Sequence, residues 1–371
     1  MSRRPEKNRE KPIKYFDYTM LFIIIFLVGF GLVMLYSTSS YNAQLKFKDS
    51  AWYLKKQVFA TAVGFFGMFV AAHIDYHYWM KLSGLAYVFA LFLCVLVIFS
   101  GENYNGSTRW LKIGPLSVQP SEIAKVATIL FLATVINKMP KQMGKMSTIM
   151  KIMILTVPIV GVVAKTNLST AIIILGIAVC LTFVASPKYK PFFLMAFWVV
   201  GFGAMFIMKE GYRAERIKIW RHPEDFEKGY QTLQGLYAIG SGGLFGKGLG
   251  ESMQKLGFLP EAQNDMIFSI ICEELGLFGA VCVILLFLLL IWRFLVIANN
   301  ASDLFGALIV VGIMAHVAIQ VILNIAVVTN SIPNTGITLP FISYGGTSVA
   351  ILLTEMGLAL SVSRGIKLEV V

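Results

Sequence analysis

An aspartate stands where a polar segment of the chain passes into a long apolar run, in the sequence Asn264-Asp265-Met266. A carboxylate at such a boundary loses part of its hydration, which raises its pKa toward that of a useful general base. The alternative is that Asp265 caps the helix predicted by the apolar run, because Asp is a favoured N-cap residue. Residue chemistry alone favours the cap. Glu273 and Glu274 follow about 100° apart on that helix, so at most one of them faces a given cavity.

A second acidic residue, Glu122, opens another apolar run and is followed three residues later by Lys125. Residues three apart share one face of a helix, and Ser121 is a reasonable cap for its start. Ionisable residues inside membrane spans are costly and are usually paired or functional. Two interpretations stay open: a structural ion pair within a helix bundle, or the wall of a polar cavity that admits the head group of a substrate.

Three basic residues, Lys209, Arg213 and Arg216, have the spacing of one helical face. Such a face suits a phosphate or pyrophosphate at the membrane surface. The alternative, which the residues alone slightly favour, is that these side chains snorkel from the end of a span. The glycine-rich segment 240–248 is not a phosphate-binding P-loop, because Gly248 stands where that motif needs Ser or Thr.

The elements that position these residues must be membrane helices. Of 371 residues, 57% are hydrophobic and 14% are charged, whereas a soluble globular chain carries about 25% charged residues. The net charge of +12 indicates cytoplasmic loops and anionic membrane lipid as partners, and no nucleic acid. The four cysteines lie in apolar runs without metal-ligand spacing, and the four histidines show no zinc-like grouping. His316 is expected to be a hydrogen-bonded core residue.

Apolar runs long enough to cross a bilayer, which takes about 20 residues, occur ten times. The sequence therefore predicts an all-α, polytopic membrane protein of about ten transmembrane helices. A large extracytoplasmic loop, 209–265, joins spans seven and eight, and a second outer loop covers 329–344. The predicted spans are residues 17–37, 57–74, 83–100, 121–137, 149–164, 168–186, 191–208, 266–297, 304–328 and 345–362.

Basic residues set the expected orientation in the cytoplasmic (inner) membrane. Residues 1–16 form a basic tail, 17–362 the ten-span membrane domain, and 363–371 a second tail. Because cytoplasmic segments collect Lys and Arg, both tails are expected in the cytoplasm. Four lysines between the first two spans, which this topology places outside, run against the rule.

Several distinctive polar segments occur along the chain, from just before the fourth span to the tenth. They are Arg109-Trp110-Leu111, Gln119 to Lys125, Ala238 to Gly248, Phe258 to Ala262, Asp265 with Ile267-Phe268, Glu273 to Gly276, and Pro333-Asn334-Thr335-Gly336 with Leu339 to Ser348. Together they resemble the SEDS family (shape, elongation, division and sporulation; the FtsW/RodA family). Hydrophobic helices matching by chance would not reproduce these polar loops.

The resemblance implies a polymerase of lipid II, which joins disaccharide-pentapeptide units carried on undecaprenyl pyrophosphate and releases the lipid pyrophosphate. Asp265 matches the essential loop aspartate of the family, which favours the base over the cap. Glu122 and Lys125 match its buried acid–base pair near a central cavity. Arg109 and Ser343, in matching segments, join them as candidate substrate contacts.

The same resemblance implies partners and a cofactor. A class B penicillin-binding transpeptidase is expected, within a divisome or an elongation complex. A divalent cation, Mg or Mn, could assist the departing pyrophosphate, with Asp265 as a possible ligand. Gly248-Leu249-Gly250 and Pro260-Glu261-Ala262 look more like the division and sporulation branch than the rod-elongation branch.

Two segments depart from the family pattern. The chain reads Thr166-Asn167-Leu168-Ser169-Thr170 where the family often has Pro-Asp-Leu-Gly/Ser-Thr, and Gln263-Asn264 where it commonly has His-Thr before the aspartate. Two rival functions also follow. A lipid II flippase would favour repeated halves and broken helices near the midplane, whereas a scaffold for a transpeptidase would not need Asp265.

Overall fold

The computed structural model describes residues 15–104, 107–113, 116–190, 192–193 and 217–366. Within them, nine helices are long and apolar enough to cross a membrane. They match nine of the ten predicted spans; the predicted span 191–208 lies outside the described residues except at 192–193. The nine are α1 (Tyr18–Phe47), α2 (Trp52–His73), α3 (His77–Ser100), α4 (Pro120–Lys138), α5 (Met146–Thr166), α6 (Leu168–Ala185), α10 (Ile267–Asn299), α11 (Leu304–Val328) and α12 (Gly346–Arg364).

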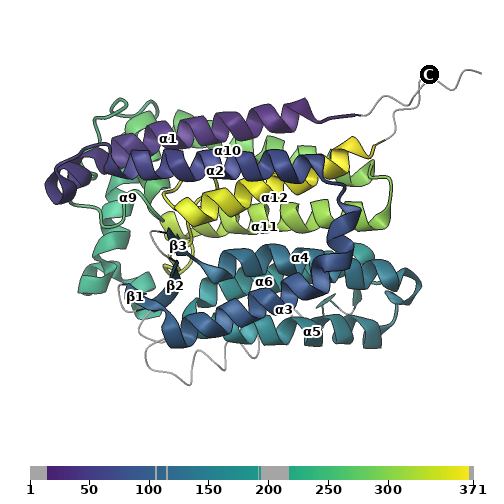
Figure 1. The fold of residues 1–371 in the computed structure, drawn as a ribbon. Coiled ribbons are helices and arrows are strands. Elements are labelled where there is room, and N and C mark those ends of the chain that lie inside the picture. The colour runs from purple at the N-terminus through teal and green to yellow at the C-terminus, as the bar shows by residue number, and fades with distance from the viewer. Residues whose placement is uncertain (1–14, 105–106, 114–115, 191, 194–216, 367–371) are drawn as a thin grey trace, which may run out of the picture.

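The nine helices lie side by side, so the bundle has two ends (Figure 1). One end, here the terminal end, brings both ends of the described chain together: the backbone N–H of Asp17 donates to the Ser363 hydroxyl at 3.4 Å. The opposite end, here the loop end, carries the short strands, α9 (Tyr230–Gly242) and the segment that follows α9. At 13 residues α9 is too short to cross a bilayer, which takes about 20.

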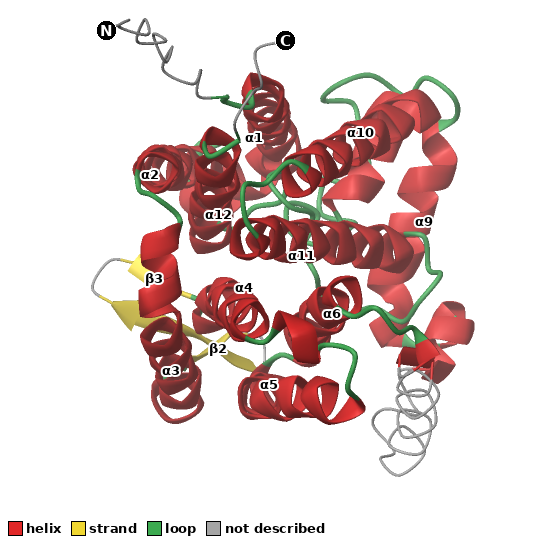
Figure 2. Cartoon of the chain, turned by 90° about the vertical axis from the view of Figure 1, so that its right-hand side faces the viewer, coloured by secondary structure: helices red, strands yellow, loops and turns green. Residues whose placement is uncertain are grey.

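Helix α11 occupies the centre of the bundle, between α10, α12, α4 and α6 (Figure 2). The outer helices α2 and α3 leave large apolar side chains such as Phe66 and Phe92 exposed, as expected where lipid is the solvent. Helices α2 and α12 pack closely through glycine: a Cβ on Gly357 would stand 2.4 Å from the Met68 carbonyl oxygen. Small residues at such crossings let membrane helices approach each other.

A small antiparallel sheet at the loop end joins α3 to α4. Its strands are β1 (Glu102–Tyr104), β2 (Ser107–Ile113) and β3 (Leu116–Val118), in the order β1-β2-β3. The register pairs Glu102 with Trp110 and Leu111 with Val118. The predicted polytopic helical fold is confirmed, whereas this sheet was not predicted, because strands this short leave no apolar alternation to detect.

Helix α10 is broken at Gly276, whose φ of 67° and ψ of −166° are not helical. The glycine-rich segment after α9 pairs with the backbone on both sides of the break. The N–H of Lys247 donates to the Glu273 carbonyl at 2.9 Å, and the N–H of Leu277 donates to the Gly243 carbonyl at 2.9 Å. The break therefore leaves few backbone groups without a partner, which is the condition for irregular structure at membrane depth.

Two further one-turn segments, η2 (Pro223–Asp225) and η3 (Glu227–Gly229), lead into α9 at the loop end, and η1 (Pro140–Gln142) joins α4 to α5.

Candidate functional site

A cleft of about 280 Å³ opens at the loop end of the bundle. Its walls come from distant parts of the chain: β2, the segment before α9, α9 itself, the start of α10 and the loop 329–345 between α11 and α12. The lining residues are Arg109, Ile219, Trp220, Lys228, Gln231, Thr232, Asp265, Asn330, Asn334, Thr335 and Gly336. Among the described residues that line the cleft, Asp265 is the only carboxylate.

Asp265 is 8% exposed and faces this cleft. The Gln231 amide donates to its Oδ1 at 3.4 Å. Burial, together with the nearby Glu261 carboxylate, raises the pKa of Asp265 to about 7, although Gln231 and Arg109 act in the opposite direction. A carboxyl group whose pKa lies near neutrality can both take and hold a proton at working pH, as a general base must.

Asp265 is not the cap of α10. The helix begins at Ile267 with Met266 in the N-cap position, and no side chain makes a capping hydrogen bond there. The interpretation favoured by residue chemistry alone was therefore wrong. The side chain turns toward Gln231 on α9 instead, because the residues before α10 form a turn that directs it into the cleft.

Six carboxylates in the described residues are buried, and five of them contact a basic side chain at 2.6–2.9 Å. Within the described residues Asp265 is the one without such an ion pair. A buried carboxylate is stable as a charged group only when it is paired. The unpaired one is therefore the candidate for proton transfer. The five pairs are Asp17–Arg293, Glu122–Lys125, Glu273–Lys247, Glu274–Lys255 and Glu355–His316.

Two cations line the same cleft. Arg109, on β2, donates from Nε to the Thr166 carbonyl at 3.1 Å, which orients its guanidinium. Lys228 lies in η3 and is exposed. The sequence predicted Arg109 as a contact, but Lys228 was missed, because nothing in its local sequence sets it apart from other loop lysines. The predicted contacts Lys209, Arg213 and Arg216 lie outside the described residues.

The loop 329–345 closes one side of the cleft through polar contacts to three other segments. Trp220 Nε1 donates to the Asn330 carbonyl at 2.8 Å, and the Asn334 amide donates to Gln231 Oε1 at 3.0 Å. Ser169, in the segment that departs from the family pattern, donates its hydroxyl to the Thr335 carbonyl at 2.8 Å. The loop carries no charge, and its position depends on these neutral contacts.

The ion pair expected between Glu122 and Lys125 is present, with Nζ and Oε1 2.9 Å apart. Both side chains are buried. The Ser348 hydroxyl donates to the other Glu122 oxygen at 2.8 Å, and Lys125 also donates to Gln320 Oε1 at 3.2 Å. Neither charge lines the cleft. The pair lies deeper, among α4, α11 and α12.

His316 is a hydrogen-bonded core residue, as expected. Its Nδ1 lies 2.9 Å from the Glu355 carboxylate, and its Nε2 lies 3.0 Å from Gln320 Oε1. A separate group of exposed side chains, His222, Glu224 and Asp225, lies outside the cleft lining, and exposed acidic groups commonly gather without binding an ion.

Ser343, a candidate substrate contact from the sequence, is buried and does not line the cleft. Its hydroxyl accepts from the Leu339 N–H at 2.8 Å, and its own N–H donates to the Leu339 carbonyl at 3.1 Å. In this arrangement Ser343 closes a turn in the loop 329–345.

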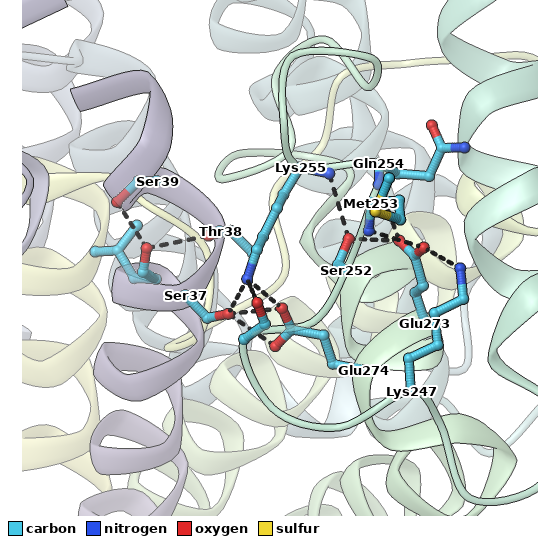
Figure 3. Close-up of polar contacts among 12 residues, drawn as sticks. Ser37, Thr38, Ser39, Lys247, Ser252, Met253, Gln254, Lys255, Glu273 and Glu274 are labelled. Atoms are coloured by element: carbon cyan, nitrogen blue, oxygen red, sulfur yellow. Dashed lines mark hydrogen bonds and ion pairs between the residues drawn. The ribbon is translucent and has the colours of Figure 1, made fainter. Parts of the chain in front are cut away.

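Glu273 and Glu274 contact different lysines of the segment between α9 and α10 (Figure 3). Lys247 lies 2.7 Å from Glu273, which also accepts from the Ser252 hydroxyl. Lys255 lies 2.8 Å from Glu274. From α1, the Ser37 hydroxyl donates to both Glu274 oxygens at 2.7 and 2.8 Å. The two carboxylates point apart, as their spacing predicts, and each holds the segment at a separate point.

The family of this chain follows from comparison with known proteins. A family model described as "Cell cycle protein", for the FtsW, RodA and SpoVE proteins, matches residues 18–368. The chain belongs to the FtsW/RodA/SpoVE family. The match covers all the described helices, so the resemblance in the polar loops extends to the whole membrane domain.

Curated FtsW/RodA/SpoVE relatives match over nearly their full length. Stage V sporulation protein E of Bacillus subtilis is 40% identical over 94% of this chain and 97% of its own. A probable peptidoglycan glycosyltransferase FtsW of a Geobacter species is 37% identical over 95% of this chain and 97% of its own. Both carry the names of the division and sporulation branch that the loop motifs indicated.

Two solved structures share the fold. One, reported under the structural coordination of polymerization and crosslinking by a peptidoglycan synthase complex, has a TM-score of 0.79 at 26% identity, over 94% of this chain and 98% of its own. The rod shape determining protein RodA of Thermus thermophilus has a TM-score of 0.69 at 26% identity, over 95% of this chain and 98% of its own.

Proposed function

We propose that this chain is a peptidoglycan glycosyltransferase that polymerises lipid II at the loop end of the bundle. The observation that carries the proposal is Asp265, a buried carboxylate without an ion pair, in a cleft that also holds Arg109 and Lys228. That combination provides a base beside cations that can receive a pyrophosphate. The names of the relatives, probable peptidoglycan glycosyltransferase among them, support the same reaction.

The proposed step uses a base for the attacking hydroxyl and cations for the leaving group. A hydroxyl oxygen of the acceptor sugar attacks the anomeric carbon of the donor, and its proton passes to the Asp265 carboxylate. The bond between that carbon and the pyrophosphate oxygen breaks, and its electron pair leaves with the undecaprenyl pyrophosphate. Arg109 and Lys228 lie where they can stabilise the negative charge that develops on that oxygen.

In the alternative role of Asp265, its carboxylate would hold a divalent cation, Mg or Mn, instead of taking the proton. Magnesium is commonly held by one or two carboxylates together with substrate phosphates. Asp265 would supply the one carboxylate, because the nearby amide oxygens of Gln231 and Asn334 already accept hydrogen bonds. When bound, the cation would stabilise negative charge on the departing pyrophosphate.

We infer that the loop end faces outward from the inner membrane and that both termini are cytoplasmic. The contact between Asp17 and Ser363 supports this inference, because it brings both ends of the described chain to one end of the bundle. Basic residues of the connections there, including Lys138 and Lys145, agree with a cytoplasmic location. Both polyprenyl tails could then remain in the outer leaflet while their head groups meet in the cleft.

The proposed partner is a class B penicillin-binding transpeptidase, in a division or sporulation complex. Support comes from the fold shared with a chain of a peptidoglycan synthase complex, and from the relatives named FtsW and Stage V sporulation protein E. Failure to co-purify with every class B transpeptidase of the same cell would contradict this part of the proposal.

Purified protein should be incubated with lipid II, alone and with a cognate transpeptidase, and the length of the glycan strands measured. We expect strands from the wild type and a loss of about 10²–10⁴-fold for Asp265→Asn. Chelation followed by addition of Mg or Mn tests the cation. If lipid II crosses vesicle membranes but no strand forms under any of these conditions, the chain is a flippase and the proposal fails.

A further inference from the structure

One asparagine connects Asp265 to the loop that closes the cleft. Asn324 lies on α11 and is completely buried. Its amide nitrogen donates to the carbonyl oxygen of Asp265 at 2.8 Å and to the carbonyl oxygen of Ile337 at 2.7 Å. Both amide hydrogens are therefore used, and they join two segments that are 72 residues apart in sequence, as their numbers show.

The orientation of the Asn324 amide is set by its two donated hydrogen bonds, to the carbonyls of Asp265 and Ile337, because its oxygen has no partner within the described residues. Its Oδ1 is buried and makes no hydrogen bond within the described residues. A buried acceptor without a partner is a cost that folding usually avoids. The arrangement therefore uses the amide as a two-pronged donor, which no apolar or purely acceptor side chain of the same size can replace.

Asn324 belongs to a polar stripe on α11 with Gln320 and His316, each four residues from the next and therefore on one helical face. The Gln320 amide donates to the Thr338 carbonyl at 3.1 Å, and its oxygen accepts from Lys125 at 3.2 Å. Asn324 thus contacts Ile337 of the loop 329–345 and Asp265, whereas Gln320 contacts the next loop residue, Thr338, and Lys125 of the Glu122–Lys125 pair.

We propose that Asn324 is a positioning residue for the glycosyl transfer: it holds the backbone of Asp265 in register with the loop 329–345, so that the carboxylate meets the acceptor hydroxyl in a closed cleft. This inference rests on the proposed function. Asn324 does not line the cleft, so it would not touch a substrate bound there. It acts through the 2.8 Å bond to Asp265.

A graded series of variants tests the role of the two donors. Asn324→Asp keeps the size but replaces both N–H donors by an oxygen that faces two carbonyls, and Asn324→Thr supplies a single hydroxyl donor. A displacement of about 1 Å at a catalytic group can lower the rate by about 10²-fold. We expect kcat to fall in the order wild type, Asn324→Thr, Asn324→Asp, with at least a tenfold loss for the last (about 1.4 kcal/mol). KM should change less than about twofold, because the groups that bind the substrate are unchanged.

The matched control is Asp17→Asn at the terminal end. Asp17 is also completely buried and pairs with Arg293 at 2.6 Å, so its replacement should lower stability without altering kcat per folded molecule. If Asn324→Asp fails to fold, Asn324→Thr provides the measurement. Wild-type kcat in either folded Asn324 variant would overturn the inference.

A second readout separates positioning from general structural damage. If Asn324 acts only through Asp265, then Asn324→Asp in an Asp265→Asn background should change the residual rate less than about twofold. An equal fold-loss in both backgrounds would show that Asn324 acts elsewhere and would also overturn the inference. Its failure is distinguishable from that of the proposed function. If only the inference on Asn324 fails, the wild type still polymerises lipid II and Asp265→Asn still shows the large loss of rate. If the proposed function fails, the wild type forms no strand.

Discussion

Replacing Asp265 by Asn should stabilise the protein while lowering its activity by about 10²–10⁴-fold, and the gain in stability should depend on pH. Burial and the Glu261 carboxylate raise the pKa of Asp265 from 3.8 to about 7 in the folded protein. The folded state therefore favours the protonated form, and the unfolded state releases that proton at much lower pH. Stability is lost progressively as pH rises from the unfolded pKa to the folded one, and no more is lost above about 7. Asn carries no such cost at any pH.

The magnitude follows from the two pKa values. Each unit of pH between them changes the free energy of unfolding by about 1.4 kcal/mol. Between about pH 5.5 and pH 7 the advantage of Asp265→Asn over the wild type should therefore grow by about 2 kcal/mol, and it should stay level from about pH 7.5 to 9. Asn keeps an Oδ1 that can accept from Gln231, and the dependence of this hydrogen bond on the protonation of Asp265 is already contained in the pKa of about 7.

The assay is unfolding of the purified wild type and variant, in the same detergent, across this range of pH, with strand formation measured in parallel. Wild-type activity should rise with pH to a half-maximum near 7, because the base must be deprotonated. Glu251→Gln, an exposed carboxylate of the preceding segment, is the control and should show no pH-dependent gain. A stability difference between Asp265→Asn and the wild type that is flat from pH 5.5 to 7 would refute the reasoning.

Three further predictions concern the groups that hold the site. Lys125→Met should lower the free energy of unfolding by about 3–5 kcal/mol, because it leaves Glu122 charged and unpaired. Adding Glu122→Gln should recover much of that loss. If the two changes in the free energy of unfolding simply add, the pair does not exist. Lys255→Met with and without Glu274→Gln should behave in the same way, and limited proteolysis of the segment between α9 and α10 should accelerate only in the single variant. Gly276→Ala should cost about 1–3 kcal/mol, because that backbone conformation is strained for any residue with a Cβ; unchanged thermal unfolding would show that α10 can close its break.

How far the sequence predicted the fold depended on the range of the interactions. The spans follow from the length and hydrophobicity of each run, which are local properties, and nine are found where the sequence placed them. The Glu122–Lys125 pair was predictable for the same reason, because a spacing of three on one helix brings the side chains together. The small sheet was missed because its strands have three to seven residues.

The candidate site was predicted only in part, because its geometry depends on contacts between distant segments. Asp265 was located by its place at the start of an apolar run, but whether it caps the helix depends on the turn before α10. The bond from Asn324 to Asp265 spans 59 residues, and that from Ser37 to Glu274 spans 237. A single sequence contains no periodicity that reports such pairs. Buried Asn, Gln and Lys inside apolar runs were the available signal, since each must find a polar partner.

The break at Gly276 separates two parts of α10 that differ in their contacts. After Gly276, α10 is an apolar span. Before Gly276, its first turns carry Glu273 and Glu274 and begin two residues after Asp265. Those turns are fixed from two sides: Lys247 and Lys255 bind the two carboxylates, and Ser37 on α1 binds Glu274. Asn324 on α11 fixes the backbone at Asp265 itself. The start of α10 and the segment before it are thus held by two separate spans, α1 through Glu274 and α11 through Asp265.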